Sequence, residues 1–297
     1  SCLVGSEMCI RDRPMTIGHE FMGEVHELGA NVKNFNLGDR VSAESHITGL
    51  SSRNAKAGKL HLDPDTVNIG VDRDGAFAEF ITVPAKNVIK LPDSISDEIG
   101  AILDPFGNAV HATLSFDLVG EDVLVTGAGP IGIMSAAIAK HVGARNVLLT
   151  DINDNRLKLA KEVCNVETLN PLKEDLKAKM TEMGLKEGFD VGLEMSGSEQ
   201  AIDQMMEAMI MGGNISLLGL PSDKIKFDLS KAIFKALNLK AIYGREIFET
   251  WYKGMALIDS GLNIENIITH KFHYTHFSEA FDLLNSGKAG KVILDWN

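Results

Sequence analysis

The segment Asp122-Val-Leu-Val-Thr-Gly-Ala-Gly-Pro-Ile-Gly132 determines how most of this chain must fold. Residues 123–125 are apolar, as in a buried strand, and the segment runs into the pattern G-x-G-x-x-G, formed by Gly127, Gly129 and Gly132. An apolar helical run follows, and a second apolar run ends at Asp151. Strand, glycine turn, helix, strand and terminal acid together form the fingerprint of a dinucleotide-binding unit.

Each position in this fingerprint has a physical reason. Gly127 permits a tight turn, Gly129 lets the backbone approach a pyrophosphate, and Gly132 lets the helix lie close to the strand. The N–H groups at the start of the helix attract phosphate. Asp151 would accept hydrogen bonds from the adenosine ribose and would repel a 2′-phosphate, so it favours NAD. The alternative is a glycine turn in an α/β core that binds no ligand.

The composition limits the class of protein. A chain of 297 residues is long enough for one large or two ordinary domains. The net charge of −12 argues against nucleic acid or an anionic membrane as a partner. No apolar run approaches the ~18 residues of a membrane span. The three cysteines, Cys2, Cys9 and Cys164, make no disulfide framework, which suits a reducing cytoplasm.

The N-terminal part reads as β structure. Residues 1–13 show no clear period and no secretory pattern, so we interpret them as a non-native leader, with an ordinary disordered terminus as the alternative. From Met15 onward, short strands with Gly, Asn and Asp turns predict a small antiparallel barrel, with a further strand over 75–83. A helix is expected near Asp97, and residues 104–114 are expected to form a loop that feeds a second helix.

The part after Asp151 alternates between apolar strands and helices as far as Tyr243. This alternation demands parallel strands with right-handed crossovers, so it predicts a doubly wound α/β sheet. We expect a helix over 199–211 and a strand over 214–220. Ligands bind such sheets outside the carboxyl ends of the strands.

Several motifs indicate a family: Gly18-His-Glu20, Gly38-Asp-Arg-Val41, the glycine turn and Gly290-Lys-Val-Ile-Leu294. Together with the stretches 104–111, 115–122, 189–197 and 242–252, they resemble the medium-chain zinc-dependent alcohol dehydrogenases, and among these the members that oxidise L-threonine. The resemblance implies a Rossmann domain over 111–245, a partial GroES-like β-barrel catalytic domain over 14–110, and a segment 246–297 that returns to the barrel domain.

The resemblance also implies a reaction. The secondary alcohol of L-threonine would be oxidised to 2-amino-3-oxobutanoate, with the hydride going to NAD and a catalytic zinc lowering the pKa of the alcohol. The resemblance implies a homotetramer for the full-length enzyme, and a cytoplasmic location is expected. The alternatives are a polyol or secondary-alcohol dehydrogenase of the same family and a non-catalytic NAD-binding module.

The implied site residues fall into two groups. His19 and Glu20 match adjacent zinc ligands, and His46 matches a histidine near the substrate. Asp104 matches an acid that would ligate the zinc or tune it from a second layer, unless it only caps a helix start. His111 is either a site residue or a packed helix residue. The matched cofactor positions are Gly127, Gly129, Ile131, Gly132, Asp151, Arg156, Leu218, Gly219, Leu220, Ile242 and Tyr243.

Two departures from the family change the expectation. The family's Cys-Gly-x-Asp segment, which carries the zinc cysteine, lies upstream of His19 and is missing here, so we expect a truncated chain with a weakened zinc site and impaired catalysis. The four cysteines of the family's structural zinc are replaced in the polar segment 45–71. Their places hold Gly49, Ser52, Ala55 and Asp63, which His61 alone does not rescue, and we predict no structural zinc.

Overall fold

The computed structural model describes residues 14–296, and the leader interpretation of residues 1–13 lies outside them. Internal contacts divide the chain into two compact units. The first unit holds residues 14–108, Gly244–Ser260 and Trp296, and the second holds Ala109–Tyr243 and Gly261–Asp295. The C-terminal segment is divided between the two units, because residues 261–295 group with the second unit.

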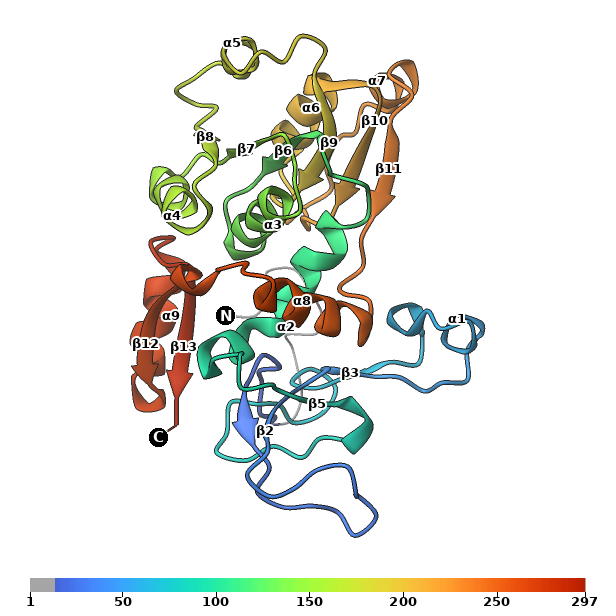
Figure 1. Ribbon diagram of the computed structural model, residues 1–297, viewed down its shortest axis with the longest axis vertical. Coiled ribbons are helices and arrows are strands. Elements are labelled where there is room, and N and C mark those ends of the chain that lie inside the picture. The colour runs from blue at the N-terminus through green and yellow to red at the C-terminus, as the bar shows by residue number, and fades with distance from the viewer. Residues whose placement is uncertain (1–13, 297) are drawn as a thin grey trace. The chain divides into compact units, whose positions relative to one another are not determined.

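A six-stranded parallel sheet forms the centre of the second unit (Figure 1). Its strands are β6 (Asp122–Thr126), β7 (Asn146–Thr150), β8 (Glu167–Leu169), β9 (Phe189–Glu194), β10 (Met209–Leu217) and β11 (Asn238–Ala241). The order is β11-β10-β9-β6-β7-β8, so the winding direction reverses between β6 and β9. This is the doubly wound dinucleotide-binding order, and the predicted fold class is confirmed.

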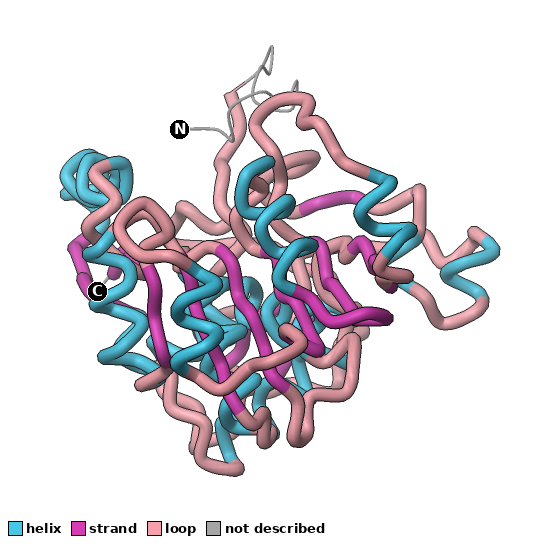
Figure 2. Tube along the Cα trace, turned by 90° about the horizontal axis from the view of Figure 1, so that it is seen from above, coloured by secondary structure: helices cyan, strands magenta, loops and turns pink. Residues whose placement is uncertain are grey.

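Helices connect these strands and run along the sheet (Figure 2). They are α3 (Pro130–His141), α4 (Asp154–Cys164), α5 (Leu176–Glu182), α6 (Glu199–Ala208) and α7 (Leu229–Phe234). Every residue of β6 is buried, as expected for a central parallel strand that is covered on both faces. Leu124, Phe189 and Met205 belong to one apolar cluster between the sheet and its helices.

The end of the second unit forms a small separate sheet. Strand β12 (Ile268–His273) pairs in parallel with β13 (Lys291–Asp295), and α9 (Phe277–Asn285) connects them. Two 3-10 turns, η4 (Glu265–Ile267) and η5 (Tyr274–His276), flank β12.

The first unit contains less regular structure. Its strands are β1 (Gly23–Glu24), β2 (Arg40–Ala43) and β5 (Val88–Lys90) in one antiparallel sheet, and β3 (His46–Ile47) paired with β4 (Val67–Asn68). Its helices are α1 (Arg53–Lys56), η2 (Leu60–Leu62), η3 (Ala85–Asn87) and α8 (Glu249–Asp259). Helix α2 (Asp97–Thr113) begins in this unit and ends in the second. No helix within residues 14–296 is long and apolar enough to cross a membrane.

Three local predictions were wrong. Residues 75–83 form no regular strand: Gly75, Ala76 and Phe77 bond to the backbone of residues 16–18, but Gly18 there has φ +94° and interrupts the ladder. Residues 104–113 continue helix α2 through Pro105 instead of forming a loop. Ile102, Leu103 and Phe106 on that helix are almost fully buried, and their packing outweighs the usual cost of an internal proline.

The third error concerns residues 209–211. They begin β10 instead of ending the preceding helix, which stops at Ala208. Met209 is buried and pairs with Phe189 on β9, and the register shifts between Met209 and Asn214. Gly212 has φ +77° inside this irregularity, so the glycine pair forms a bulge within a strand and not a helix end.

Candidate functional site

His19, Glu20 and Asp104 come together in the first unit. One potential ligand atom from each lies within 4.8 Å of the other two. An imidazole nitrogen with carboxylate oxygens is a donor set that zinc accepts in catalytic sites. The residue types and their proximity therefore fit a divalent metal ion, as the predicted pairing of His19 and Glu20 with Asp104 requires.

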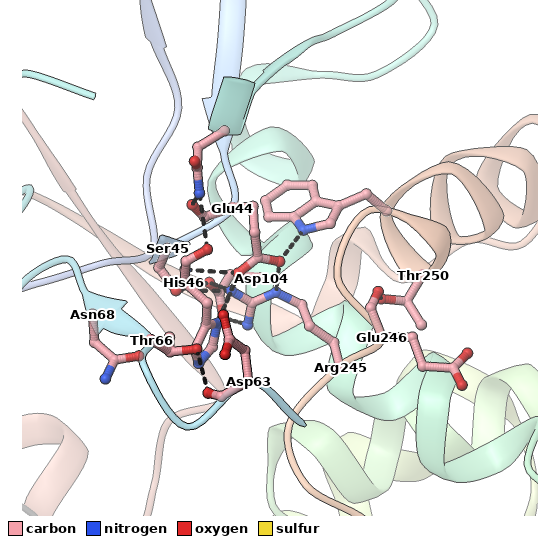
Figure 3. Close-up of polar contacts among 12 residues, drawn as sticks. Glu44, Ser45, His46, Asp63, Thr66, Asn68, Asp104, Arg245, Glu246 and Thr250 are labelled. Carbon is pink, nitrogen blue, oxygen red and sulfur yellow. Dashed lines mark hydrogen bonds and ion pairs between the residues drawn. The ribbon is translucent and has the colours of Figure 1, made fainter. Parts of the chain in front are cut away.

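Asp104 is also one arm of a buried ion-pair network centred on Arg245 (Figure 3). Nη1 of Arg245 donates to Oδ1 of Asp104 at 2.7 Å, and Nη2 lies 2.6 Å from Oδ2. On its other edge, Arg245 donates from Nε and Nη2 to the two carboxylate oxygens of Glu44, at 2.7 and 2.6 Å. The side chains are at most 4% exposed, so one guanidinium joins two buried carboxylates through paired hydrogen bonds.

Three neighbours complete this network. The hydroxyl of Ser45 accepts from Nη2 of Arg245 at 2.8 Å and donates to Asp104 at 3.2 Å. Nε1 of Trp251 donates to Glu44 at 2.9 Å. Nδ1 of His46 lies 2.7 Å from Oε1 of Glu44 and 3.2 Å from Nη2 of Arg245.

Charges in the network are strongly coupled. Burial raises the pKa of Glu44, but the charge of Arg245 and the hydrogen bond from His46 outweigh it and bring this pKa to about 2. Burial raises the pKa of Asp104, with Arg245 opposing it. Glu20, Glu44, Asp104 and Arg245 together carry two formal negative charges when ionised, which a divalent cation would balance.

The glycine turn lies in the second unit, at the carboxyl end of β6. Gly127 has φ +92°, and a Cβ added to Gly132 would lie 1.8 Å from the carbonyl oxygen of Gly127. Both positions therefore require glycine, for backbone conformation and for close packing respectively. Gly129 is the N-cap of α3, and a Cβ there would meet nothing within 4 Å, so this position is open above the helix N-terminus.

Asp151 follows β7 and holds the same turn. Its Oδ2 accepts from the backbone N–H of Ala128 at 2.6 Å, and its Oδ1 accepts from that of Asn153 at 2.8 Å. Nη1 of Arg156, on α4, lies 3.9 Å from Oδ2. The structure thus brings Asp151 and Arg156 together with the glycine turn, and all of these were matched to cofactor positions in the sequence.

The remaining cofactor positions lie on neighbouring strand ends. The N–H groups of Leu218 and Gly219, just after β10, both bond to the carbonyl oxygen of Glu194 at 3.0 Å. Ile242, just after β11, bonds to Leu217 at 2.9 Å and is buried, whereas Leu220 and Tyr243 are 81% and 65% exposed. Ile131 lies in the first turn of α3 and is partly buried. The described strand ends therefore carry exposed apolar surface at the carboxyl edge of the sheet.

The polar segment 45–71 is held by hydrogen bonds. Asp63, which is buried, accepts from the backbone N–H groups of Gly49 and Leu50 at 2.8 and 3.3 Å. A hydrogen bond from Ser52 and the bonds from the backbone lower the pKa of Asp63. Ser52 also caps α1, bonding to Ala55 at 3.1 Å. The four positions predicted to have lost cysteine thus serve local backbone contacts.

Sequence reasoning missed Glu44, Arg245 and Trp251. Glu44 follows the short strand β2, where a charged side chain is normally solvent-exposed. Arg245 lies in the stretch 242–252 that resembles the family, but no role was assigned to it. Their roles depend on contacts between residues far apart in the sequence, because Glu44 lies 201 positions from Arg245 and 207 positions from Trp251. His111, left open above, is 7% exposed within α2.

Comparison with known proteins identifies the family. The family described as zinc-binding dehydrogenase matches residues 130–260, and the alcohol dehydrogenase GroES-like domain matches residues 3–93. The L-threonine 3-dehydrogenase of Ruegeria pomeroyi is 57% identical over 284 residues, which are 95% of this chain and 83% of that protein. The chain belongs to the L-threonine 3-dehydrogenase family. It is an oxidoreductase, as the motifs predicted.

Solved structures agree with this family's fold. A 2R,3R-butanediol dehydrogenase from Bacillus subtilis superimposes with a TM-score of 0.86 at 26% identity, covering 95% of this chain and 81% of that one. An Escherichia coli enzyme described as a short chain alcohol dehydrogenase, solved with NADH, also gives 0.86 at 26% identity, with 94% and 83% covered. The L-threonine 3-dehydrogenase family therefore shares the predicted two-part architecture with alcohol dehydrogenases of other specificities.

Proposed function

We propose that this chain oxidises L-threonine to 2-amino-3-oxobutanoate, with NAD as the hydride acceptor and a zinc ion held by His19, Glu20 and Asp104. The observation that carries the proposal is the approach of these three side chains to within 4.8 Å of one another. The choice of substrate is supported by the 57% identity to an L-threonine 3-dehydrogenase. Zinc at this position would lower the pKa of the substrate alcohol.

Arg245 and His46 have further roles in the proposed reaction. Arg245 holds both oxygens of Asp104, so that this carboxylate keeps one orientation beside His19 and Glu20. In the tautomer that donates from Nδ1 to Glu44, Nε2 of His46 is the ring atom that can accept a proton or a hydrogen bond from the substrate. We assign the catalytic roles to Asp104 and His46 on this basis.

The cofactor proposal rests on the second unit. The glycine turn at the N-terminus of α3 suits a pyrophosphate, and Asp151 at the end of β7 suits the two free hydroxyls of an adenosine ribose. An NADH complex of a relative at 26% identity supports a nicotinamide cofactor. Arg156, 3.9 Å from Asp151, adds a contact on the adenosine side.

Formation of NADH tests the proposal directly. L-threonine with NAD is expected to give turnover that depends on added zinc, and NADP is expected to be a poorer acceptor. Butanediol and a polyol serve as competing substrates, because they represent the rival dehydrogenase function. A preference for either one over L-threonine would reject the substrate assignment, whereas NADH binding without turnover of any alcohol would reject the proposal that this chain is catalytic.

The homotetramer and the cytoplasmic location stay predictions from the resemblance and the cysteine content. Light scattering coupled to size-exclusion chromatography measures the first. A mass that corresponds to one chain in solution would contradict the tetramer.

A further inference from the structure

Glu194 is a buried acid that the proposed reaction leaves without a role. It is the last residue of β9, and its register partners are Thr126 and Leu217, the last residues of β6 and β10. It is 0% exposed. A carboxylate thus lies inside the carboxyl edge of the sheet, beside the switch point at which dinucleotides bind.

Neutral donors surround this carboxylate. Oε1 accepts from the backbone N–H of Ser196 at 2.8 Å, from that of Gly197 at 3.0 Å, and from the hydroxyl of Thr126 at 3.3 Å. The hydroxyl of Ser196 donates to the same oxygen, and Gly197 also reaches Oε2 at 3.2 Å. Because a buried charge is costly unless it is fully hydrogen-bonded, the carboxylate holds the loop after β9 firmly against β6.

The loop after β10 is tied to the same residue. Leu218 and Gly219 donate their N–H groups to the carbonyl oxygen of Glu194. A Cβ added to Gly219 would lie 2.2 Å from the nitrogen of Gly197 and 2.6 Å from Oε2 of Glu194. One added to Gly197 would lie 2.4 Å from the carbonyl oxygen of Leu220. The two loops therefore touch backbone to backbone around the carboxylate.

The glycine turn joins this arrangement. A Cβ added to Gly127 would lie 2.9 Å from the nitrogen of Ser196, so the loop after β6 packs directly on the loop after β9. Three strand-end loops thus meet at one acid. The carboxylate of Glu194 accepts from Thr126, which precedes the loop after β6, and from Ser196 and Gly197 in the loop after β9. The backbone carbonyl of Glu194 accepts from Leu218 and Gly219 in the loop after β10.

We propose that Glu194 is a positioning residue that holds the loops after β9 and β10 against the glycine turn, in the arrangement that binds the nicotinamide half of NAD. The inference rests on the proposed function. Dinucleotide-binding sheets consist of two mononucleotide-binding halves. Asp151 belongs to the half made by β6, β7 and β8, whereas the loops after β9 and β10 belong to the other half. Glu194 therefore governs binding of the whole dinucleotide more than binding of its adenylate part.

The experiment measures the affinities of this chain for NADH and for AMP by calorimetry. Glu194→Gln keeps the size of the side chain but replaces charge-assisted hydrogen bonds with neutral ones. It is expected to weaken NADH binding about tenfold, while AMP binding stays within about twofold of the wild type. Ser196→Ala, which keeps the carboxylate and removes one donor, is expected to weaken NADH binding about threefold.

Asp122→Asn is the matched control. Asp122 is also a buried acid, 2% exposed, but it begins β6 at the opposite edge of the same sheet, where it bonds to Arg145 and Asn146. The same acid-to-amide change there is expected to leave both affinities unchanged.

Each outcome separates the hypotheses. Equal NADH affinities in Glu194→Gln, Ser196→Ala and the wild type would overturn the positioning role. A parallel loss of NADH and AMP binding would overturn it as well, since it indicates general damage to the unit. A wild-type chain that binds neither ligand would instead reject the proposed cofactor, and the role of Glu194 with it.

Discussion

Arg245 donates from Nη1 to Oδ1 of Asp104 at 2.7 Å, joining two side chains that lie 141 positions apart in the sequence. Since the same guanidinium also binds Glu44 through paired hydrogen bonds, the orientation of Asp104 is set before any metal binds. Partners that orient a ligand in this way tune metal sites without touching the metal. Four predictions follow from this site and from the glycine turn.

Replacing Arg245 with Met is expected to destabilise the chain by about 3–5 kcal/mol, because two buried carboxylates lose their common cation. Arg245→Lys keeps the charge but cannot form paired hydrogen bonds with both carboxylates, so it is expected to restore only part of the stability. Denaturant unfolding measures both. Lys253→Gln, which removes an exposed ion pair with Glu249, is the control and is expected to cost less than about 0.5 kcal/mol. A loss no greater than this control would contradict the role of the network.

Glu44→Gln tests the same network through pH. The folded pKa of Glu44, about 2, lies below its ordinary value of 4.5, so the unfolded state binds the proton more readily and stability rises with pH between these values. The wild type is expected to exceed the variant by about 3 kcal/mol at neutral pH. This excess should shrink as the pH falls from 4.5 and vanish near 2. A difference that does not depend on pH would rule out an ionised Glu44.

Zinc is expected to stabilise the wild-type chain against heat, and a chelator is expected to reverse the effect. At a free zinc concentration of about 100 times Kd, the gain is about 2.7 kcal/mol. His19→Ala and Glu20→Gln should each remove most of this gain, because each deletes a metal donor. His276→Ala, a change at an exposed histidine paired with Glu279, serves as the control and should respond to zinc as the wild type does.

Two glycine substitutions in one turn are expected to fail for different reasons. Gly132→Ala would place a Cβ 1.8 Å from the carbonyl oxygen of Gly127, so it should lower the stability of the second unit by several kcal/mol. Gly129→Ala meets no atom within 4 Å and has φ −69°, so the chain should fold normally but bind NADH more weakly, by about tenfold or more. Melting temperature and NADH affinity, measured on both variants, separate these effects. Normal NADH binding by Gly129→Ala would argue against a pyrophosphate above this residue.

Much of the second unit could be predicted from the sequence. The glycine turn, Asp151 and the alternation of strands and helices depend on local requirements: a positive φ, a short contact within one βαβ unit, and the period of apolar residues. The elements that were predicted wrongly are those in which contacts with residues far away in the sequence outweigh the local sequence preference. Helix α2 continues through Pro105 because its apolar face is buried, and Met209 joins β10 because Phe189 pairs with it.

The sequence by itself determined the doubly wound sheet, the glycine turn and the acid at the end of β7, because each of these is encoded within a few dozen neighbouring residues. Only the tertiary structure decided that His19, Glu20 and Asp104 meet, that Arg245 joins Asp104 to Glu44, and that Glu194 ties three loops together. These contacts join residues from separate strands and helices. A buried charge gains its hydrogen-bond partners only when the chain folds, so no local sequence pattern predicts which residues these partners are.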